Sequence, residues 1–220
     1  MTWEKLLPLL WKGIGETLYM TFASSLIAYA IGLPLGILLV ITRKDGIRPM
    51  PTFNTVLGVI INFLRSIPFI IMLALLFPVT RAIVGTAIGT TAVIFPLIIS
   101  AFPYVARMVE GSLAEVDHGI IEAAQSMGSS NWQIIYKVLL PEAVPSLVNG
   151  AAISVTTILG YTAMASAAGG GGLGSLAIVK GLNVRKYDVV YSASILLVLL
   201  VQIITVFGTR FTRSLDHKKR

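Results

Sequence analysis

Long uninterrupted runs of apolar residues dominate the chain, with little polar sequence between them. Each of five such runs is long enough to cross a bilayer core about 30 Å thick, which takes roughly 20 apolar residues in a helix. Alternation with a period of two is absent, and a lone strand cannot satisfy its backbone in lipid. The pattern therefore predicts an all-α, polytopic integral membrane protein with five transmembrane helices, at about 17–41, 56–80, 82–105, 143–167 and 189–209.

The connections between these runs add two expectations. The second and third runs are nearly fused at Arg81, which predicts a tight hairpin of two helices. The N-terminal run Leu6–Trp11 is short and contains Pro8, and no small-residue cleavage site follows it. We interpret it as an interfacial segment that lies on the membrane and not as a cleaved signal.

Two pairs of glycines have a spacing of four, Gly32 with Gly36 and Gly85 with Gly89. Pairs of small residues at this spacing let helix backbones approach closely in lipid. The pattern favours general helix packing over one specific dimer seam.

Composition supports the membrane assignment. Apolar residues make up 55% of the 220 residues and charged residues 12%, whereas soluble domains carry about 25% charged residues. The net charge of +7 would suggest nucleic acid for a soluble chain, but basic residues at membrane flanks set orientation. We therefore expect no nucleic-acid partner. The chain has no cysteine, which excludes disulfides, thiolate metal sites and cysteine nucleophiles.

The distribution of Lys and Arg predicts the orientation. Five spans with the C-terminus inside place ten basic residues on the inner side: Arg43, Lys44, Arg48, Arg107, Lys137, Arg210, Arg213, Lys218, Lys219 and Arg220. The outer side then holds six: Lys5, Lys12, Arg81, Lys180, Arg185 and Lys186. This asymmetry predicts an N-terminus outside and a C-terminus in the cytoplasm.

One inner segment, Arg107–Pro141, is too polar to span and too patterned to be a linker. Asp117 is a candidate N-cap for a short helix, with Gly128 as its left-handed terminator. Ser130 and Gln133 form a capping-box pattern for a second helix that runs to Leu140. The segment predicts two short helices, at about 112–140, on the inner membrane face, where a partner can dock.

The same segment resembles the EAA loop of the permeases of ABC importers. The matching pattern is Glu122, Ala123 and Ala124, then three residues, Gly128, nine residues, and Val138 to Pro141 with Leu140. Val138 stands where the family usually has isoleucine. The resemblance implies that this loop is the pair of coupling helices that fits a groove on an ATPase subunit. An amphipathic helix on the lipid surface is the alternative, which the acidic charge of the segment disfavours.

The resemblance extends over nearly the whole chain and points to the methionine-importer permeases, in the segments Arg65–Phe69, Ala106–Glu110, Lys137–Pro145, Gly160–Met164 and Gly171–Gly174. It implies the type I ABC importer permease fold as a single transmembrane domain over residues 1–220. It also implies a homodimer, two copies of an ABC ATPase, an extracytoplasmic binding protein and a bacterial cell membrane.

Several residues inside the spans are candidates for the translocation path. Arg65 is the one charge well inside a predicted span, and Ser66 and Pro68 lie beside it. An intramembrane charge indicates function by default. Pairing of Arg65 with carbonyls freed by Pro68, or a gating role, is favoured over binding of a substrate carboxylate.

The fourth run supplies the other candidates, Thr157, Tyr161 and Met164, with Met164 as a soft apolar gate. Hydrogen bonding of its hydroxyls within their own helix is an equally good interpretation. The glycine-rich stretch Gly169–Gly174 lacks the strand that a dinucleotide site needs. We interpret it as a flexible outer loop, with an inert turn as the alternative.

No arrangement in the sequence indicates catalysis or a resident cofactor. The isolated His118 and His217 predict solvated side chains, because a metal site needs several ligands. A Walker motif is absent, so ATP and Mg²⁺ are expected on the partner ATPase. The sequence thus predicts a non-enzymatic permease that moves L-methionine and D-methionine inward by alternating access. A permease for another amino acid is the alternative, and an ion-coupled transporter or channel is disfavoured because the spans lack Asp, Glu and His.

Overall fold

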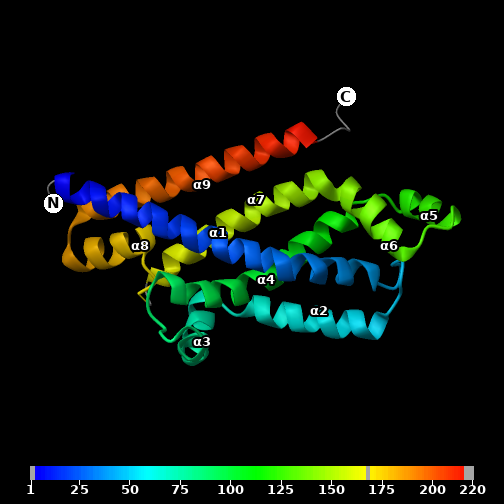
Figure 1. Cartoon of the computed structure of the whole chain (residues 1–220), viewed down its shortest axis with the longest axis horizontal. Helices are drawn as coiled ribbons and strands as arrows, with labels where there is room; N and C mark the ends of the chain where they lie inside the picture. Colours follow the sequence, from blue (N-terminus) through cyan, green and yellow to red (C-terminus); the bar gives the residue numbers. More distant parts are fainter. Residues whose placement is uncertain (1–2, 167–168, 216–220) are drawn as a thin grey trace.

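The computed structural model describes residues 3–166 and 169–215 as an elongated bundle of helices, without a strand in those two ranges (Figure 1). Helices α5 and α6 lie at one end of the bundle, which we call the α5 end, and α8 lies toward the other, the α8 end. Among the described residues, four helices are long and apolar enough to cross a membrane, and a bent pair brings the number to five if it counts as one span.

The first span is part of a much longer helix than predicted. Helix α1 runs from Trp3 to Ile41, 39 residues or about 58 Å, and so exceeds the apolar bilayer core. Pro8 lies in its second turn, where it removes one hydrogen bond without ending the helix. The predicted separate interfacial segment is therefore wrong, because the N-terminal residues continue the helix of the first span.

The second predicted span, 56–80, is broken. Helices α2 (Pro51–Ser66) and α3 (Phe69–Val84) meet at an angle of 100°. A residue before proline avoids helical geometry, and Ile67 is extended, with φ −78° and ψ 119°. Pro68 then serves as the N-cap of α3. The predicted hairpin at Arg81 is also wrong, since α3 continues to Val84 and α4 begins at Thr90.

Helix α4 (Thr90–Ala114) is the most buried of the long helices and packs along α1. A Cβ on Gly32 would lie 2.7 Å from Val105, and one on Gly36 would lie 2.6 Å from Val109. These glycines allow the close packing that their spacing predicted. Gly85 and Gly89 do not, because both have positive φ in the connection between α3 and α4.

The fourth span begins earlier than predicted. Helices α5 (His118–Ser126) and α6 (Asn131–Ile134) are followed by a π-helical turn, η1 (Ile135–Leu139), and then by α7 (Leu140–Ala165). The last three form one continuous helix, Asn131–Ala165. The predicted separate helix that ends at Leu140 is thus the first part of the fourth span. Ala167, the predicted end of that span, lies outside the described residues.

A further short helix lies at the α8 end. Helix α8 (Gly172–Ser175) continues through a π turn, η3 (Leu176–Gly181), and a 3₁₀ turn, η4 (Leu182–Val184). The final helix, α9 (Tyr187–Leu215), then returns along the bundle toward the α5 end (Figure 1).

Candidate coupling and translocation site

Local hydrogen bonds define α5 in the way its sequence predicts. Asp117 Oδ1 accepts a hydrogen bond from the N–H of Gly119 at 2.6 Å and caps the helix. Gly128 ends the turn with a φ of +78°, and the N–H of Ser129 donates to the carbonyl of Ala124 at 3.1 Å. Such a left-handed terminator satisfies the last carbonyls of a helix. Both predicted ends of this helix are therefore present.

The predicted capping box of α6 is also present. Ser130 Oγ accepts from the N–H of Gln133 at 3.3 Å, and Gln133 Oε1 accepts from the N–H of Ser130 at 2.8 Å. In η1, the N–H of Leu140 donates to the carbonyl of Ile135, one residue further back than in an α-helix. This wider turn accommodates Pro141, whose ring would clash with the carbonyl four residues earlier. The helix thus passes through the proline without a break.

The two faces of α5 have different surroundings. Ile121 and Ala124 pack on a buried cluster that joins α1, α4 and α7. Glu122 and Ala123 are exposed. Large apolar side chains of the neighbouring turns are also exposed: Met127 (86%), Trp132 (71%) and Tyr136 (65%). The segment is therefore anchored on one side to the transmembrane core and presents an apolar surface with one carboxylate on the other.

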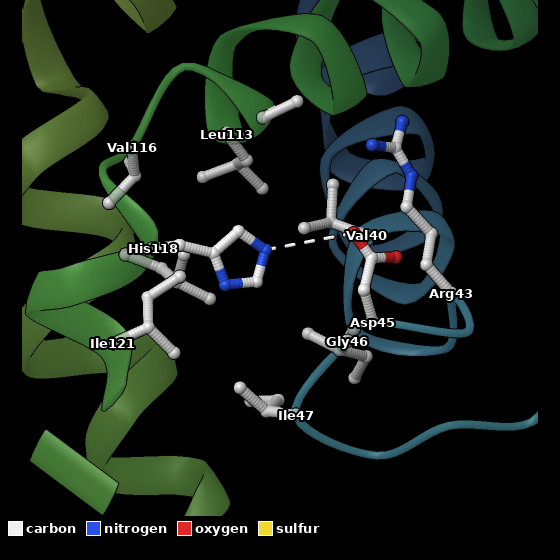
Figure 2. Close-up of a pocket in the computed structure, with 12 residues that line it drawn as sticks. Val40, Arg43, Asp45, Gly46, Ile47, Leu113, Val116, His118 and Ile121 are labelled. Carbon is white, nitrogen blue, oxygen red and sulfur yellow. Dashed lines mark ion pairs between the residues drawn. The ribbon is translucent and has the colours of Figure 1, made fainter.

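A small cavity of about 120 Å³ lies behind α5, against the end of α1 (Figure 2). Its walls include apolar side chains of α1, α4 and α5, among them Val40, Leu113 and Ile121. His118 Nε2 lies 3.6 Å from Asp45 Oδ2 in the connection between α1 and α2. The His118 side chain is 60% exposed, as its sequence predicted, and lies near Asp45. His217 lies outside the described residues.

An ion cluster that sequence reasoning missed lies just before α5. Glu110 is only 8% exposed, and its two carboxylate oxygens accept from Arg43 at 2.7 Å and from Arg107 at 2.5 Å. Arg107 also donates to the carbonyl of Gly58 at 3.0 Å. The cluster ties α4 to α2 and to the end of α1. Its one sequence signal is the spacing of three between Arg107 and Glu110, which places both on one helix face.

The break between α2 and α3 lies beside the helix that carries the other path candidates. The rings of Phe69 and Tyr161 are stacked, with centroids 5.0 Å apart. Arg65 and Pro68 are exposed, and no group in the described part of the chain bonds to the Arg65 side chain. The expected pairing of Arg65 with carbonyls freed by Pro68 is therefore not found. Ser66 donates to the carbonyl of Asn62 at 2.7 Å.

Hydroxyl groups in α7 mostly bond within their own helix. Thr157 donates to the carbonyl of Ile153 at 2.9 Å, and Ser154 donates to that of Gly150 at 2.8 Å. Tyr29 of α1 adds a bond to Ser154, at 3.2 Å. Met164 is 53% exposed in the single chain. The structure thus brings Pro68, Tyr161 and Met164 to one region of the bundle, where the rings of Phe69 and Tyr161 stack.

The described residues contain no group of three or more His, Asp or Glu side chains that could hold a metal ion. Their structure is that of a polytopic helix bundle with a broken span and an exposed two-helix segment at one end. These features define an integral membrane helix bundle with an exposed segment outside its spans.

Comparisons with known proteins agree with this class. Residues 32–220 match the family described as binding-protein-dependent transport system inner membrane component. A probable D-methionine transport system permease protein MetI of Pasteurella multocida is 46% identical over 215 residues, which cover 96% of this chain and 99% of that protein. The D-methionine transport system permease protein MetI of Escherichia coli (strain K12) is 49% identical over 160 residues, or 71% of this chain and 74% of that one.

A solved structure described as an inward-facing conformation of the MetNI methionine ABC transporter (CY5 SeMet soak crystal form) matches with a TM-score of 0.96. It is 45% identical and the match covers 99% of this chain and 100% of that one. The chain belongs to the binding-protein-dependent transport system inner membrane components and has the type I ABC importer permease fold. It is a transport subunit and not an enzyme, as its sequence predicted.

Proposed function

We propose that this chain is the permease subunit of an importer that moves methionine, in its L and D forms, into a bacterial cell. Two copies would form the membrane path, and two copies of an ABC ATPase would bind ATP and Mg²⁺ on the cytoplasmic side. An extracytoplasmic binding protein would deliver the substrate. The relatives named above are permeases of methionine systems at 46–49% identity, which supports this substrate over another amino acid.

The observation that carries the proposal is the geometry of the α5–α6 segment. Its exposed side holds Glu122, Ala123 and Gly128 of the EAA pattern. At the start of α7, Pro141 is exposed and Leu140 is partly buried. Small side chains permit close approach of a partner, and Glu122 offers an acceptor for a basic group. The partner would be the ATPase, to which Met127 and Trp132 offer apolar contact area.

The connections of this segment support a mechanical role. Helix α4 ends at Ala114 and α5 begins at His118, while α6 continues directly into α7. A displacement of α5 therefore acts on α4 and α7 together, through the cluster on which Ile121 packs. ATP binding would pull on residues 112–140, rotate α2 to α7 and open the path outward, and hydrolysis would reset it.

The path itself would run along α7 and the break before α3. We propose Thr157, Tyr161 and Met164 as lining residues, with Met164 as the gate and Arg65, Ser66 and Pro68 at the break. The exposure of Met164 in the single chain fits a residue that faces a second copy. The Arg65 side chain, which bonds to no group among residues 3–166 and 169–215, is available for a substrate carboxylate or for a gating contact.

The proposed orientation has an outside N-terminus and a cytoplasmic C-terminus. The described basic residues assigned to the inner side lie on segments at the α5 end: the α1–α2 connection, the end of α4, η1 and the end of α9. Such an excess near short connections favours the cytoplasmic side. The α8 end would then face the binding protein.

Uptake of labelled methionine tests the proposal, in cells that lack their own methionine importers and express this chain with its native ATPase and binding protein. We expect saturable, energy-dependent uptake that only methionine-like compounds compete for. Energy-dependent uptake of a different amino acid, without uptake of methionine, would contradict the proposed substrate but support the assignment as an importer permease. Absence of any energy-dependent uptake from an assembled complex would overturn the importer.

A further inference from the structure

Residues 169–174, which lead into α8, are packed too closely for the free loop that their glycines predicted. Gly172 has a φ of +73°, and a Cβ there would lie 2.7 Å from Thr17 Oγ1. A Cβ on Gly174 would lie 2.6 Å from the carbonyl oxygen of Ala163. Backbone therefore rests directly on backbone where α8 meets the last turns of α7. The prediction of a flexible outer loop is replaced by a docked one.

Two polar side chains of α1 receive the first N–H groups of α8. Glu16 Oε2 accepts from the N–H of Gly172 at 2.7 Å, and Thr17 Oγ1 accepts from the N–H of Leu173 at 2.9 Å. The first N–H groups of a helix have no partner within it. A carboxylate is a strong acceptor there, because the bond is charge-assisted and the helix dipole favours negative charge. Glu16 thus fastens α8 to α1.

The contact of α8 with α7 lies next to the proposed path. Ala163, on which Gly174 rests, precedes Met164. The N–H of Gly170 also donates to the carbonyl of Ala165, at 3.1 Å. The position of α8 therefore determines where the last turn of α7 can lie. Glu16 itself is 25 residues from the end of α1, about 37 Å along the helix, beyond the thickness of one apolar core.

We propose that Glu16 is a positioning residue for the outer gate: its carboxylate holds α8 against α1, and α8 in turn holds Met164 in its closed position. The inference rests on the proposed transport function. It assigns a role in transport to a charge outside both the coupling segment and the path. A merely structural Glu16 would affect stability without opening the path.

Passive flux through the assembled complex tests this role. Complexes of the chain with its native ATPase are reconstituted in liposomes, and labelled methionine flux is measured without ATP or binding protein. We expect Glu16→Ala to raise this flux roughly tenfold, the change in equilibrium that loss of one capping hydrogen bond brings. Glu16→Gln keeps an acceptor oxygen and should restore a low flux. Amide hydrogen exchange over residues 169–174 should follow the same order as the flux, with the fastest exchange in Glu16→Ala and slow exchange in Glu16→Gln and the wild type.

Lys12→Ala is the matched control. Lys12 Nζ lies 3.7 Å from Glu16 Oε1, so its loss removes the ion pair but keeps both acceptors of α1. We expect wild-type flux from this variant. If Glu16→Ala does not assemble, Thr17→Val removes the companion acceptor without a change of charge and should leak in the same way.

Two results would overturn the positioning role. One is low, wild-type flux in Glu16→Ala or Thr17→Val complexes whose exchange at 169–174 has risen. The other is equal leakage from Lys12→Ala. Failure of the proposed function is recognised separately: the wild-type complex would then accumulate no methionine with ATP and binding protein, while the exchange measurement still tests the contact between Glu16 and α8.

Discussion

At the scale of single residues, Gly128 determines the shape of the segment that would meet the ATPase. Its φ of +78° lies where side chains are rarely tolerated, and a Cβ there would meet nothing within 4 Å. Substitution therefore strains the turn by about 1 kcal/mol without a steric clash. Glu110, by contrast, is surrounded by protein, because it is buried between Arg43 and Arg107.

Gly128→Asp should leave expression and membrane insertion intact but uncouple transport from ATP hydrolysis. The physical reason is that the strained turn shifts Glu122 and its neighbours relative to the partner, while the transmembrane core is untouched. The measurement is the ratio of methionine taken up to ATP hydrolysed. Gln125→Asp, on an exposed position of α5, adds the same charge without backbone strain and should behave as wild type. Normal coupling in Gly128→Asp would contradict the assignment of the loop.

Glu110→Ala should destabilise the folded chain by about 2 kcal/mol, since it leaves the partly exposed Arg43 and Arg107 without their charged acceptor. The loss would appear as a lower unfolding midpoint in detergent. Glu115→Ala, at an exposed position a turn further along, should change stability by less than about 0.5 kcal/mol. Equal effects of the two substitutions on the unfolding midpoint would mean that the ion cluster does not stabilise the folded chain.

At the scale of elements, the break between α2 and α3 decides the architecture of the second span. It follows from one dipeptide, because Pro68 forces Ile67 out of helical geometry. Helix α2 has 16 residues, about 24 Å, and so is shorter than the apolar core of a bilayer. The turn of 100° brings Phe69 against Tyr161 and so links the break to the path.

Pro68→Ala should straighten this break and impair uptake, because a helix through Ile67 moves Phe69 away from Tyr161. Spin labels at Asn62→Cys and Ala74→Cys measure the change. They would lie about 18 Å apart along a straight helix and closer in the bent pair. Pro78→Ala, within α3, should leave the distance between the labels unchanged. A distance of about 18 Å in the labelled chain that retains Pro68 would contradict the bend.

The sequence predicted those elements whose geometry is set locally. The N-cap at Asp117, the left-handed Gly128 and the capping box of Ser130 with Gln133 all depend on residues within a few positions of one another. Burial of Glu110 and capping of α8 by Glu16 depend on residues 67 and 156 positions away in the sequence. The break at Pro68 is also set locally, by the dipeptide of Ile67 and Pro68, but hydropathy does not show it, because apolar residues continue through it.

At the scale of the whole molecule, the turns that follow α8 and the end of α9 lie toward opposite ends of the bundle (Figure 1). This separation makes the orientation testable without background labelling, since the chain has no cysteine. Asn183→Cys lies in η4 near the α8 end, and Ser214→Cys lies near the end of α9, both at exposed positions.

A membrane-impermeant maleimide should label Asn183→Cys in intact spheroplasts and Ser214→Cys only after the membrane is permeabilised. The physical basis is the excess of Lys and Arg on the cytoplasmic side. Labelling of Ser214→Cys from outside, with Asn183→Cys protected, would reverse the orientation and with it the proposed docking sides of the ATPase and the binding protein.

The central claim is that ATP hydrolysis on a partner moves substrate through this chain. Its most direct test is transport by the purified complex in liposomes, with the ATPase side facing a medium that contains ATP and Mg²⁺ and the binding protein with labelled methionine enclosed on the other side. The account predicts movement of methionine toward the ATPase side, against its gradient, and loss of this movement without ATP or without the binding protein. Movement that is independent of ATP and follows only the gradient would contradict it.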